Sequence, residues 1–285
     1  MSDESTIFTI QWGDELRPLA QQMTEKLAGT TEEKHGVVGE RTTMEQVAPR
    51  SMKKRTIRHA PVVPSDPDLR RRWITMFDYD DYALFDKQDQ LKTLLDPKNA
   101  FNRSLIMGGN RLKDQVRIDA AIADTYYGKD GTSTVSVAAA IANGGTGLTQ
   151  AKMRQINENY DTNNVDPDEE KFIIIGPKDH TDLIKLSEVT SRDFNDRPVL
   201  VKGRVEYWMG HKIIVSNLLS TTSGVTKCIS FVRSGIGIAF AMDFELSVDQ
   251  RADLTGKPWQ ASANISVGAA RLEETKVQEC DTYHA

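Results

Sequence analysis

The sequence predicts an α+β fold with a mixed α/β layer in its middle. Three observations lead to this class. The strongest helical periodicity lies between residues 96 and 127. The apolar run KFIIIG at 171–176 is followed by Pro177 and a helical pattern, which indicates a buried strand and then a helix. Beyond residue 199 the chain consists mainly of segments rich in β-branched residues, which favour strands.

The first third of the chain is predicted to be extended apart from one helix. Residues 1–12 have the composition of an extended arm, and residues 14–28 carry apolar side chains at helical spacing. Residues 37–47 and 55–63 alternate roughly and contain β-branched residues, so we expect them to form the two sides of a long hairpin or loop. Residues 72–85 are expected to return as a third extended piece.

Two consecutive helices are predicted after residue 96. Asp96 and Pro97 suit the N-cap and the first position of a helix over 97–107, which Gly108 and Gly109 should break or kink. Residues 110–127 then show the most regular apolar stripe in the chain, so we expect its strongest helix there.

Strands dominate the rest of the prediction. We expect a strand near 133–139, a boundary loop that ends in GGTG at 144–147, and a helix from its N-cap Thr149 to about residue 161. A helix should also run from Pro177 through Leu186. The predicted C-terminal strands are 199–208, 211–216, 227–233, 236–241, 260–270 and 272–280.

Composition narrows the class of protein. The 285 residues carry a net charge of −5 and are 39% hydrophobic, which is enough for one large domain or two modest ones. No apolar run approaches the roughly 20 residues of a membrane span, and the N-terminus lacks the pattern of a signal peptide. Cys228 and Cys280 are far apart in the sequence, so no disulfide framework is expected. We therefore expect a protein of a reducing cytosol with no membrane segment.

No catalytic constellation stands out in the sequence. The HExxH, GxSxG, Walker A and GxGxxG patterns are absent, and the five histidines are scattered. His180 is expected to be a surface histidine and Cys228 a small core residue. DPDEE at 166–170 lacks the glycine and the spacing of a calcium loop, and GGTG at 144–147 suits a flexible turn better than a phosphate cradle. The sequence thus predicts no enzyme, no catalytic residue, no metal and no cofactor.

Residues 50–72, called the basic segment below, are the most unusual part of the chain. They hold eight Lys/Arg against two Asp, a balance of +6, whereas the other 262 residues sum to −11. Pro61, Pro64 and Pro67 punctuate the segment, which has too few apolar residues to form a core of its own. Three roles are open: a solvated loop, contact with nucleic-acid phosphates, or docking on an acidic surface of another subunit.

Docking is the favoured role because the chain itself supplies an acidic surface. Residues 76–89 carry five Asp and one Lys, and complementary patches on identical copies suit contacts that close into rings or shells. Nucleic-acid contact ranks last because the segment lacks stacking aromatics. The residues assigned to the contact between subunits are Arg50, Lys53, Lys54, Arg55, Arg58, Arg70, Arg71 and Arg72. The acidic acceptors are Asp78, Asp80, Asp81 and Asp86.

The order of elements resembles that of the major capsid proteins of tailed bacteriophages, which have the Hong Kong 97 (HK97) fold. These proteins share an N-terminal arm, a long extended loop, a helix pair, a mixed middle and returning C-terminal strands. The stretches that carry the resemblance are DYDDYALFDKQDQLKTLLDP (78–97), NRLKDQVRIDAAIADTYYG (110–128), GTGLTQAKM (145–153), EVTSRDFNDRPVLVKGRVEYWMGHKIIVSN (188–217) and GAARLEETKVQEC (268–280). The resemblance spans nearly the whole chain.

The resemblance implies a division into four regions. An arm and short helix would cover 1–35, and an extended loop that lies across a neighbouring subunit would cover 36–82. A peripheral domain with a long spine helix would be formed by 83–135 and 246–285. An axial domain, which clusters at fivefold and sixfold axes, would be formed by 136–245.

The resemblance also implies function and partners. Copies of the chain would form the hexamers and pentamers of an icosahedral shell around double-stranded DNA, which would be enclosed without sequence-specific binding. Further partners would be a portal and separate scaffolding or cement proteins. The protein would be assembled in the bacterial cytoplasm and reside in the virion. Some family members crosslink Lys to Asn, but nothing identifies an acceptor for Lys53 or Lys54, so no crosslink is predicted. The alternative function is a nucleic-acid-binding protein that uses residues 50–72.

Overall fold

The computed structural model describes residues 19–52, 54–56, 64, 66–85, 98–137, 139–186, 200–201 and 203–284. The chain divides into two compact units. The first unit contains residues 1–24, 78–111 and 243–265, and the second contains 25–77, 112–242 and 266–285. Four elements, α2, β4, β15 and β16, contribute residues to both units.

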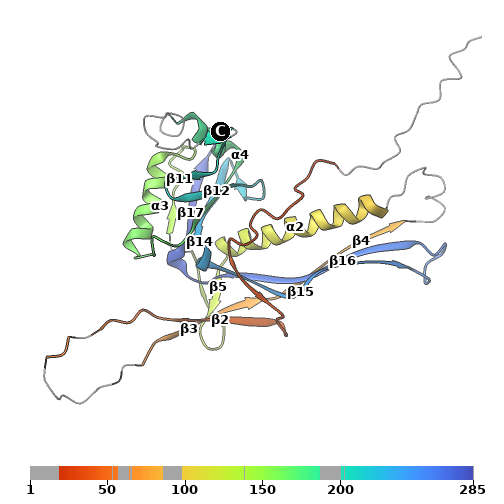
Figure 1. Cartoon of the computed structure of the whole chain (residues 1–285), viewed down its shortest axis with the longest axis horizontal. Helices are drawn as coiled ribbons and strands as arrows, with labels where there is room; N and C mark the ends of the chain where they lie inside the picture. Colours follow the sequence, from red (N-terminus) through yellow and green to blue (C-terminus); the bar gives the residue numbers. More distant parts are fainter. Residues whose placement is uncertain are drawn as a thin grey trace, which may run out of the picture. The chain divides into compact units, whose positions relative to one another are not determined.

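The second unit contains a seven-stranded mixed sheet in the order β11-β12-β8-β14-β17-β7, with β13 paired to β14 (Figure 1). Its strands are β7 (Ala139–Ile141), β8 (Lys171–Ile175), β11 (Tyr207–Trp208), β12 (His211–Val215), β13 (Thr221–Thr222), β14 (Val225–Val232) and β17 (Val277–Tyr283). The helices α3 (Gln150–Thr162) and α4 (Pro177–Lys185) pack with this sheet around the largest core, in which Met153, Ile173 and Leu183 are fully buried. In this strand order the final strand β17 lies inside the sheet, between β14 and β7.

A smaller sheet with the order β2-β3-β5-β6 holds the hairpin of the second unit. The hairpin is formed by β2 (Arg41–Val47) and β3 (Leu69–Thr75), which pair antiparallel from Arg41 opposite Thr75 to Val47 opposite Leu69. The strands β5 (Thr125–Tyr127) and β6 (Ser133–Val135) complete the sheet. Figure 1 shows β2 and β3 side by side.

A third sheet has the order β1-β15-β16-β4. It consists of β1 (Glu32–His35), β15 (Ile236–Gln250), β16 (Trp259–Arg271) and β4 (Phe77–Phe85). β1 pairs parallel with the start of β15. In the first unit, Ala261 and Ala263 of β16 form a small core with Leu105 of the helix α2 (Lys98–Ile122). The remaining short elements are β9 (Leu200–Val201), β10 (Arg204–Val205) and the 3₁₀ helices η3 (Arg233–Gly235) and η4 (Glu274–Lys276).

Several predicted elements are confirmed. Thr149 caps α3, and its hydroxyl accepts from the backbone N–H of Lys152. The run KFIII forms the buried strand β8, and Pro177 opens α4. The C-terminal strands are present with shifted bounds: 236–241 extends to Gln250, 199–208 divides into β9, β10 and β11, and 272–280 becomes η4 followed by β17.

The predicted pair of helices is wrong in two respects. One continuous helix runs from Lys98 to Ile122, and Gly108 and Gly109 lie within it. A β-carbon on Gly109 would lie 2.5 Å from the ring of Phe244, so this glycine accommodates a close neighbour instead of breaking the helix. Residues 125–127, predicted as the last turn, form β5 instead. Tertiary packing therefore overrides the local breaker pattern here.

The predicted helix over 14–28 is not present in its described part. Residues 19–28 are irregular, and Leu19 and Met23 are 89% and 66% exposed, whereas Leu27 is buried. The carboxylate of Asp114 accepts from the backbone N–H groups of Lys26 and Leu27, at 2.9 and 3.1 Å. A side chain of α2 thus satisfies donors that a local helix would otherwise satisfy, and residues 14–18 lie outside the described part.

The hairpin has a different partner from the predicted one. We expected 37–47 to face 55–63, but Arg41–Val47 pairs with Leu69–Thr75. Most of 55–63 lies outside the described residues. The single strand predicted near 133–139 is also wrong. This part of the chain forms two short strands, β6 and β7, which belong to different sheets.

Candidate functional site

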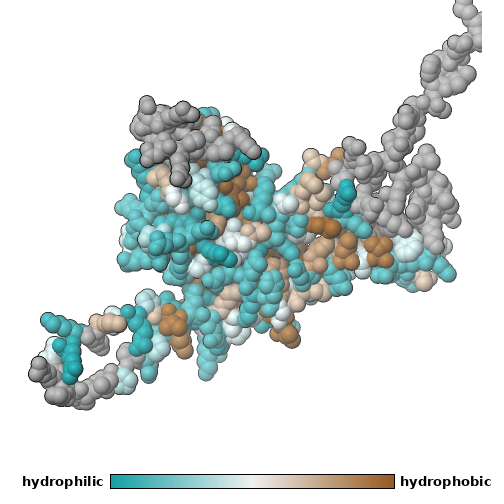
Figure 2. All heavy atoms as spheres, viewed as in Figure 1, coloured by the Kyte–Doolittle hydropathy of each residue, from teal (hydrophilic) through white to brown (hydrophobic). Residues whose placement is uncertain are grey.

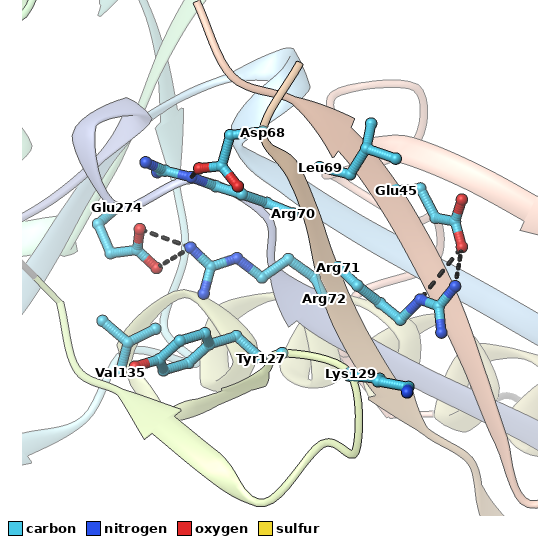
Figure 3. A pocket seen from close by; sticks show the side chains of 11 residues that line it. Glu45, Asp68, Leu69, Arg70, Arg71, Arg72, Tyr127, Lys129, Val135 and Glu274 are labelled. Atoms are coloured by element: carbon cyan, nitrogen blue, oxygen red, sulfur yellow. Dashed lines mark hydrogen bonds and ion pairs between the residues drawn. The ribbon is translucent and has the colours of Figure 1, made fainter. Parts of the chain in front are cut away.

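A cavity of about 740 Å³ lies at the root of the hairpin, within the second unit. β3 contributes Leu69 to Arg72, β2 contributes Glu45, and the β5–β6 connection contributes residues from Tyr127 to Lys129. Glu274 of η4 completes the lining from a distant part of the sequence. Figure 3 shows these side chains gathered around the stretch of β3 that holds the three consecutive arginines. The cavity therefore lies where the basic segment joins the folded unit.

Arg72 is built into the fold at this root. Its Nε donates to the carbonyl of Leu272 at 2.9 Å, and its Nη2 donates to the carboxylate of Glu274 at 2.7 Å. Its guanidinium carbon lies 5.5 Å from the centroid of the Tyr127 ring. The residue is 5% exposed. The assignment of Arg72 to a contact between subunits therefore needs correction, because its charge is already paired inside its own chain.

Arg70 and Arg71 remain at the surface of the same strand. Arg71 lies opposite Glu45 in the hairpin register, and its Nη2 donates to that carboxylate at 2.5 Å. Arg70 lies 3.8 Å from the carboxylate of Asp68, with both side chains well exposed. Exposed pairs of this kind contribute only about 0–1 kcal/mol, so both arginines can exchange partners at little cost.

The other predicted basic residues divide into two groups. Arg50, Lys54 and Arg55 are exposed, in the chain that follows β2. Lys53 and Arg58 lie outside the described residues. Val47 and Leu69, which face each other at the last pair of the hairpin ladder, are 63% and 69% exposed. Figure 2 shows hydrophilic and hydrophobic side chains together on the hairpin, a mixture typical of contact surfaces.

The predicted acidic acceptors lie on β4 of the first unit. Asp78, Asp80 and Asp81 are all exposed, and Asp86 lies outside the described residues. The neighbouring aromatics Phe77 and Tyr82 are 57% and 55% exposed. The strand thus presents acidic and apolar side chains together.

Sequence reasoning missed several residues of this site. Glu274 follows Arg72 by 202 positions, and no local pattern links the two. Lys129 is exposed on the β5–β6 connection and lines the cavity, but it falls outside every charged run that we singled out. Only the pairing of β3 with β5 brings Lys129 beside the arginines.

The GGTG turn is held by a buried lysine. Nζ of Lys152 lies 2.8–3.0 Å from four main-chain oxygens, those of Asn143, Thr146, Gly147 and Asp281. The ammonium group therefore joins the turn, the first part of α3 and the last strand. The turn serves this structural role, and its prediction as a loop is confirmed.

The titratable core residues form structural contacts. His284 Nε2 lies 2.8 Å from Oδ1 of the fully buried Asp179, whose other oxygen lies 3.4 Å from Sγ of Cys228. Burial raises the pKa of Cys228 well above its usual range, so the thiol stays protonated, and its prediction as a core residue is confirmed. His180, expected at the surface, is half-buried and accepts from the backbone N–H of Val205 at 3.2 Å.

No group of three or more His, Cys, Asp or Glu side chains in the described part of the chain could hold a metal ion. Among the described helices, none combines the length and the apolar character that a membrane crossing requires.

Comparison with known proteins identifies the class of molecule. A family model described as phage capsid protein matches residues 5–282. The chain belongs to the phage capsid protein family. It is accordingly a major capsid protein, a structural subunit of a phage head shell. No curated protein matches this capsid protein.

Solved structures show that the capsid protein has the HK97-like α+β fold. The capsid of cyanophage P-SCSP1u is 16% identical, with a TM-score of 0.74 over 99% of this chain and 94% of that chain. The structure from Mycobacterium phage Che8 is 14% identical in sequence, with a TM-score of 0.73 over 96% of this chain and 97% of that chain. Cyanophage Pam1 is 11% identical, with a TM-score of 0.74 over 99% of both chains. At such low identities the likeness concerns the fold.

Proposed function

We propose that this capsid protein self-assembles, as hexamers and pentamers of identical copies, into an icosahedral head shell that encloses the double-stranded DNA of a tailed phage. The family match over residues 5–282 supports a shell subunit. One structure of the same fold, from a GTA particle, is a capsid computed with fivefold symmetry, at a TM-score of 0.74. The work of such a protein is geometric, because one chain must make several different contacts with its own copies.

The observation that carries the proposal is the hairpin with its exposed cationic continuation. β2 and β3 pair over their full length, and the ladder continues through the hydrogen bond from Ala48 N–H to the carbonyl of Asp68. Beyond it, Arg50, Lys54 and Arg55 are exposed. A hairpin whose described continuation carries exposed cations is suited to lie on a neighbouring copy.

The surface that receives these cations is, in our proposal, the acidic strand β4 of a neighbouring copy, with Asp78, Asp80 and Asp81 as acceptors. All three are exposed on a single chain. Exposed ion pairs are individually weak and salt-sensitive. Repetition across a shell adds many such contacts, so avidity supplies the stability that a single contact lacks.

The finer assignments accompany this proposal. Residues 1–35 would form the arm, 36–82 the extended loop, 83–135 with 246–285 the peripheral domain, and 136–245 the axial domain. A portal and separate scaffolding or cement proteins would be the other partners, and assembly would take place in the bacterial cytoplasm. The protein would have no catalytic role. The acidic balance of the chain, −5 overall, suits a shell that encloses DNA without binding it tightly.

Assembly of the purified protein tests the proposal. Sedimentation and electron microscopy should detect closed particles from the wild-type chain. The triple variant Arg50→Glu, Lys54→Glu, Arg55→Glu should remain folded and form few closed particles. The control variant Arg50→Lys, Lys54→Arg, Arg55→Lys keeps all three positive charges and should assemble normally. Reversal at Arg72 is unsuitable here because that residue is buried.

Two outcomes would count against the proposal. Normal shells from the triple variant would contradict docking through the basic segment. Binding of free DNA by particle-free protein, with a steep dependence on salt, would instead favour a nucleic-acid-binding function for residues 50–72, which the family match does not support.

A further inference from the structure

The turn that follows β7 contains the one Asn-Gly pair of the sequence, Asn143 and Gly144. The backbone N–H of Thr146 donates to the carbonyl of Asn143 at 3.0 Å and closes a β-turn. Gly144 and Gly145, the two central residues, have φ angles of 56° and 68°. Two positive angles in a row define a type I′ turn, in which glycine is strongly preferred. The turn therefore requires the small residue that follows Asn143.

The side chain of Asn143 is folded back over this turn. The backbone N–H of Gly145 donates to Oδ1 of Asn143 at 3.0 Å. The ring that this hydrogen bond closes contains the backbone nitrogen of Gly144, so the side-chain carbonyl carbon, Cγ, is held close to that nitrogen. In the described part of the chain, neither the N–H of Gly144 nor Nδ2 of Asn143 has a hydrogen-bond partner. A nucleophile and a leaving group therefore lie free on two sides of one carbonyl carbon.

The nucleophile is also accessible to water. Gly144 and Gly145 are exposed, and Asn143 is half-buried. A β-carbon on Gly144 would have nothing within 4 Å, so neighbouring groups leave this part of the backbone uncovered. Because glycine has no side chain, the residue itself does not shield its nitrogen either. The site thus combines a fixed side-chain amide with an open backbone nitrogen.

We infer that Asn143 is a site of spontaneous intramolecular deamidation. The backbone nitrogen of Gly144 loses its proton to water and attacks Cγ, while the N–H of Gly145 stabilises the negative charge that develops on Oδ1. The bond from Cγ to Nδ2 then breaks, and Nδ2 leaves as ammonia with a proton from water. Water opens the resulting succinimide ring at either carbonyl group, which yields aspartate or isoaspartate. The reaction consumes one water, releases one ammonia and needs no oxidant.

The modification acts on contacts that hold the last strand. The carbonyl groups of Asn143 and Thr146 both accept from the buried ammonium of Lys152, and Thr146 also accepts from the backbone N–H of Tyr283 at 2.9 Å. Isoaspartate routes the main chain through the former side chain, so the carbonyl of residue 143 becomes a carboxylate beside the chain. The turn loses its closing hydrogen bond, and its hold on β17 weakens.

Peptide mapping of the full chain by mass spectrometry tests the inference. During prolonged incubation in neutral buffer, Asn143 should convert at least about tenfold faster than the exposed Asn163 and Asn217, a difference of about 1.4 kcal/mol in barrier height. Isoaspartate, detected with isoaspartyl methyltransferase, should be part of the product because direct hydrolysis of the side chain yields aspartate alone. Equal rates at the three sites, or aspartate without isoaspartate, would overturn the inference.

The same chain unfolded in urea separates the contribution of the fold from that of the Asn-Gly pair. The native protein should convert Asn143 at least as fast as the unfolded chain, because the turn already holds Cγ beside the nitrogen of Gly144. A native rate that is lower by about tenfold or more would show that the turn protects the side chain, and the inference would be wrong.

A matched variant tests the effect on the last strand. Asn143→Ser removes the amide but keeps an oxygen that can accept from Gly145, so it should stay folded and show no conversion. Hydrogen-exchange mass spectrometry should find faster exchange in β17 after incubation of the wild-type protein and no change after incubation of the variant. Unchanged exchange in converted wild-type protein would contradict the weakened hold on β17.

Discussion

The guanidinium of Arg72 donates to the carboxylate of Glu274 at 2.7 Å, across 202 positions of sequence. The side chains are 6% and 17% exposed, so this is a largely buried ion pair at the root of the hairpin. It joins β3 to the segment between β16 and β17. The end of the basic segment is thereby anchored, whereas Arg50, Lys54, Arg55 and Arg70 stay exposed.

Loss of this pair should destabilise the folded chain. Arg72→Ala leaves the Glu274 carboxylate without its partner, and breaking a buried pair in this way costs about 3–5 kcal/mol. The exposed neighbour provides a matched control, since Arg71→Ala should cost about 1 kcal/mol or less. Urea unfolding monitored by circular dichroism measures both. Equal effects of the two substitutions would show that burial does not distinguish the arginines.

Alanine substitutions at the two adjacent glycines of α2 should change the stability of the protein in opposite directions. Gly109→Ala places a β-carbon 2.5 Å from the ring of Phe244, and overpacking of this kind costs about 1–3 kcal/mol. Gly108 has nothing within 4 Å of such a carbon, so Gly108→Ala should stabilise the helix by about 1 kcal/mol. Differential scanning calorimetry of the two variants checks the prediction. A stabilising Gly109→Ala would mean that Phe244 moves aside readily.

Lys152 should be essential to the packing of the last strand. Lys152→Met removes the donor that serves four main-chain oxygens, and unsatisfied buried groups cost about 1–3 kcal/mol each. We expect a loss of stability together with faster amide exchange in β17 and in the turn at 144–147. Hydrogen-exchange mass spectrometry reports both regions. The exposed Lys178→Met in α4 is the control, and equal exchange in the two variants would contradict the role of the buried ammonium.

Stability should fall in mild acid because of His211. Burial lowers the pKa of this histidine to about 4, and a backbone hydrogen bond to Met209 opposes the shift only in part. The folded state holds the ring neutral, while the unfolded chain takes up a proton near pH 6.5. The contribution of His211 is therefore fully present above pH 6.5 and is lost as pH falls toward 4.

Denaturation at a series of pH values tests this prediction. His211→Gln should reduce the slope of the unfolding free energy against pH between pH 6.5 and 4. One such group contributes up to about 1.4 kcal/mol per pH unit to that slope. An unchanged slope in His211→Gln would mean that other groups dominate the acid response.

Short-range chemistry is what the sequence by itself determined. Thr149 as a cap, Pro177 at a helix start and the run at 171–175 each depend on neighbours within a few residues, so the local pattern was sufficient for α3, β8 and α4. The composition of the basic segment and the acidic character of 78–81 are likewise properties of the chain. The order of all these elements carried the resemblance to the HK97-like capsid proteins, which the family match confirms.

Tertiary structure alone decided which of these charges remain available. Arg70, Arg71 and Arg72 are equivalent in sequence, but the contacts with Leu272 and Glu274 bury only the last. Phe244 occupies the space beside Gly109 within the continuous helix α2, and the carboxylate of Asp114 binds the amides of Lys26 and Leu27 in the irregular segment 19–28. Each outcome depends on a partner about 80 to 200 positions away, whose placement follows from the whole set of strand pairings. No local pattern encodes such a partner, because its free energy contribution exists only once the fold has formed.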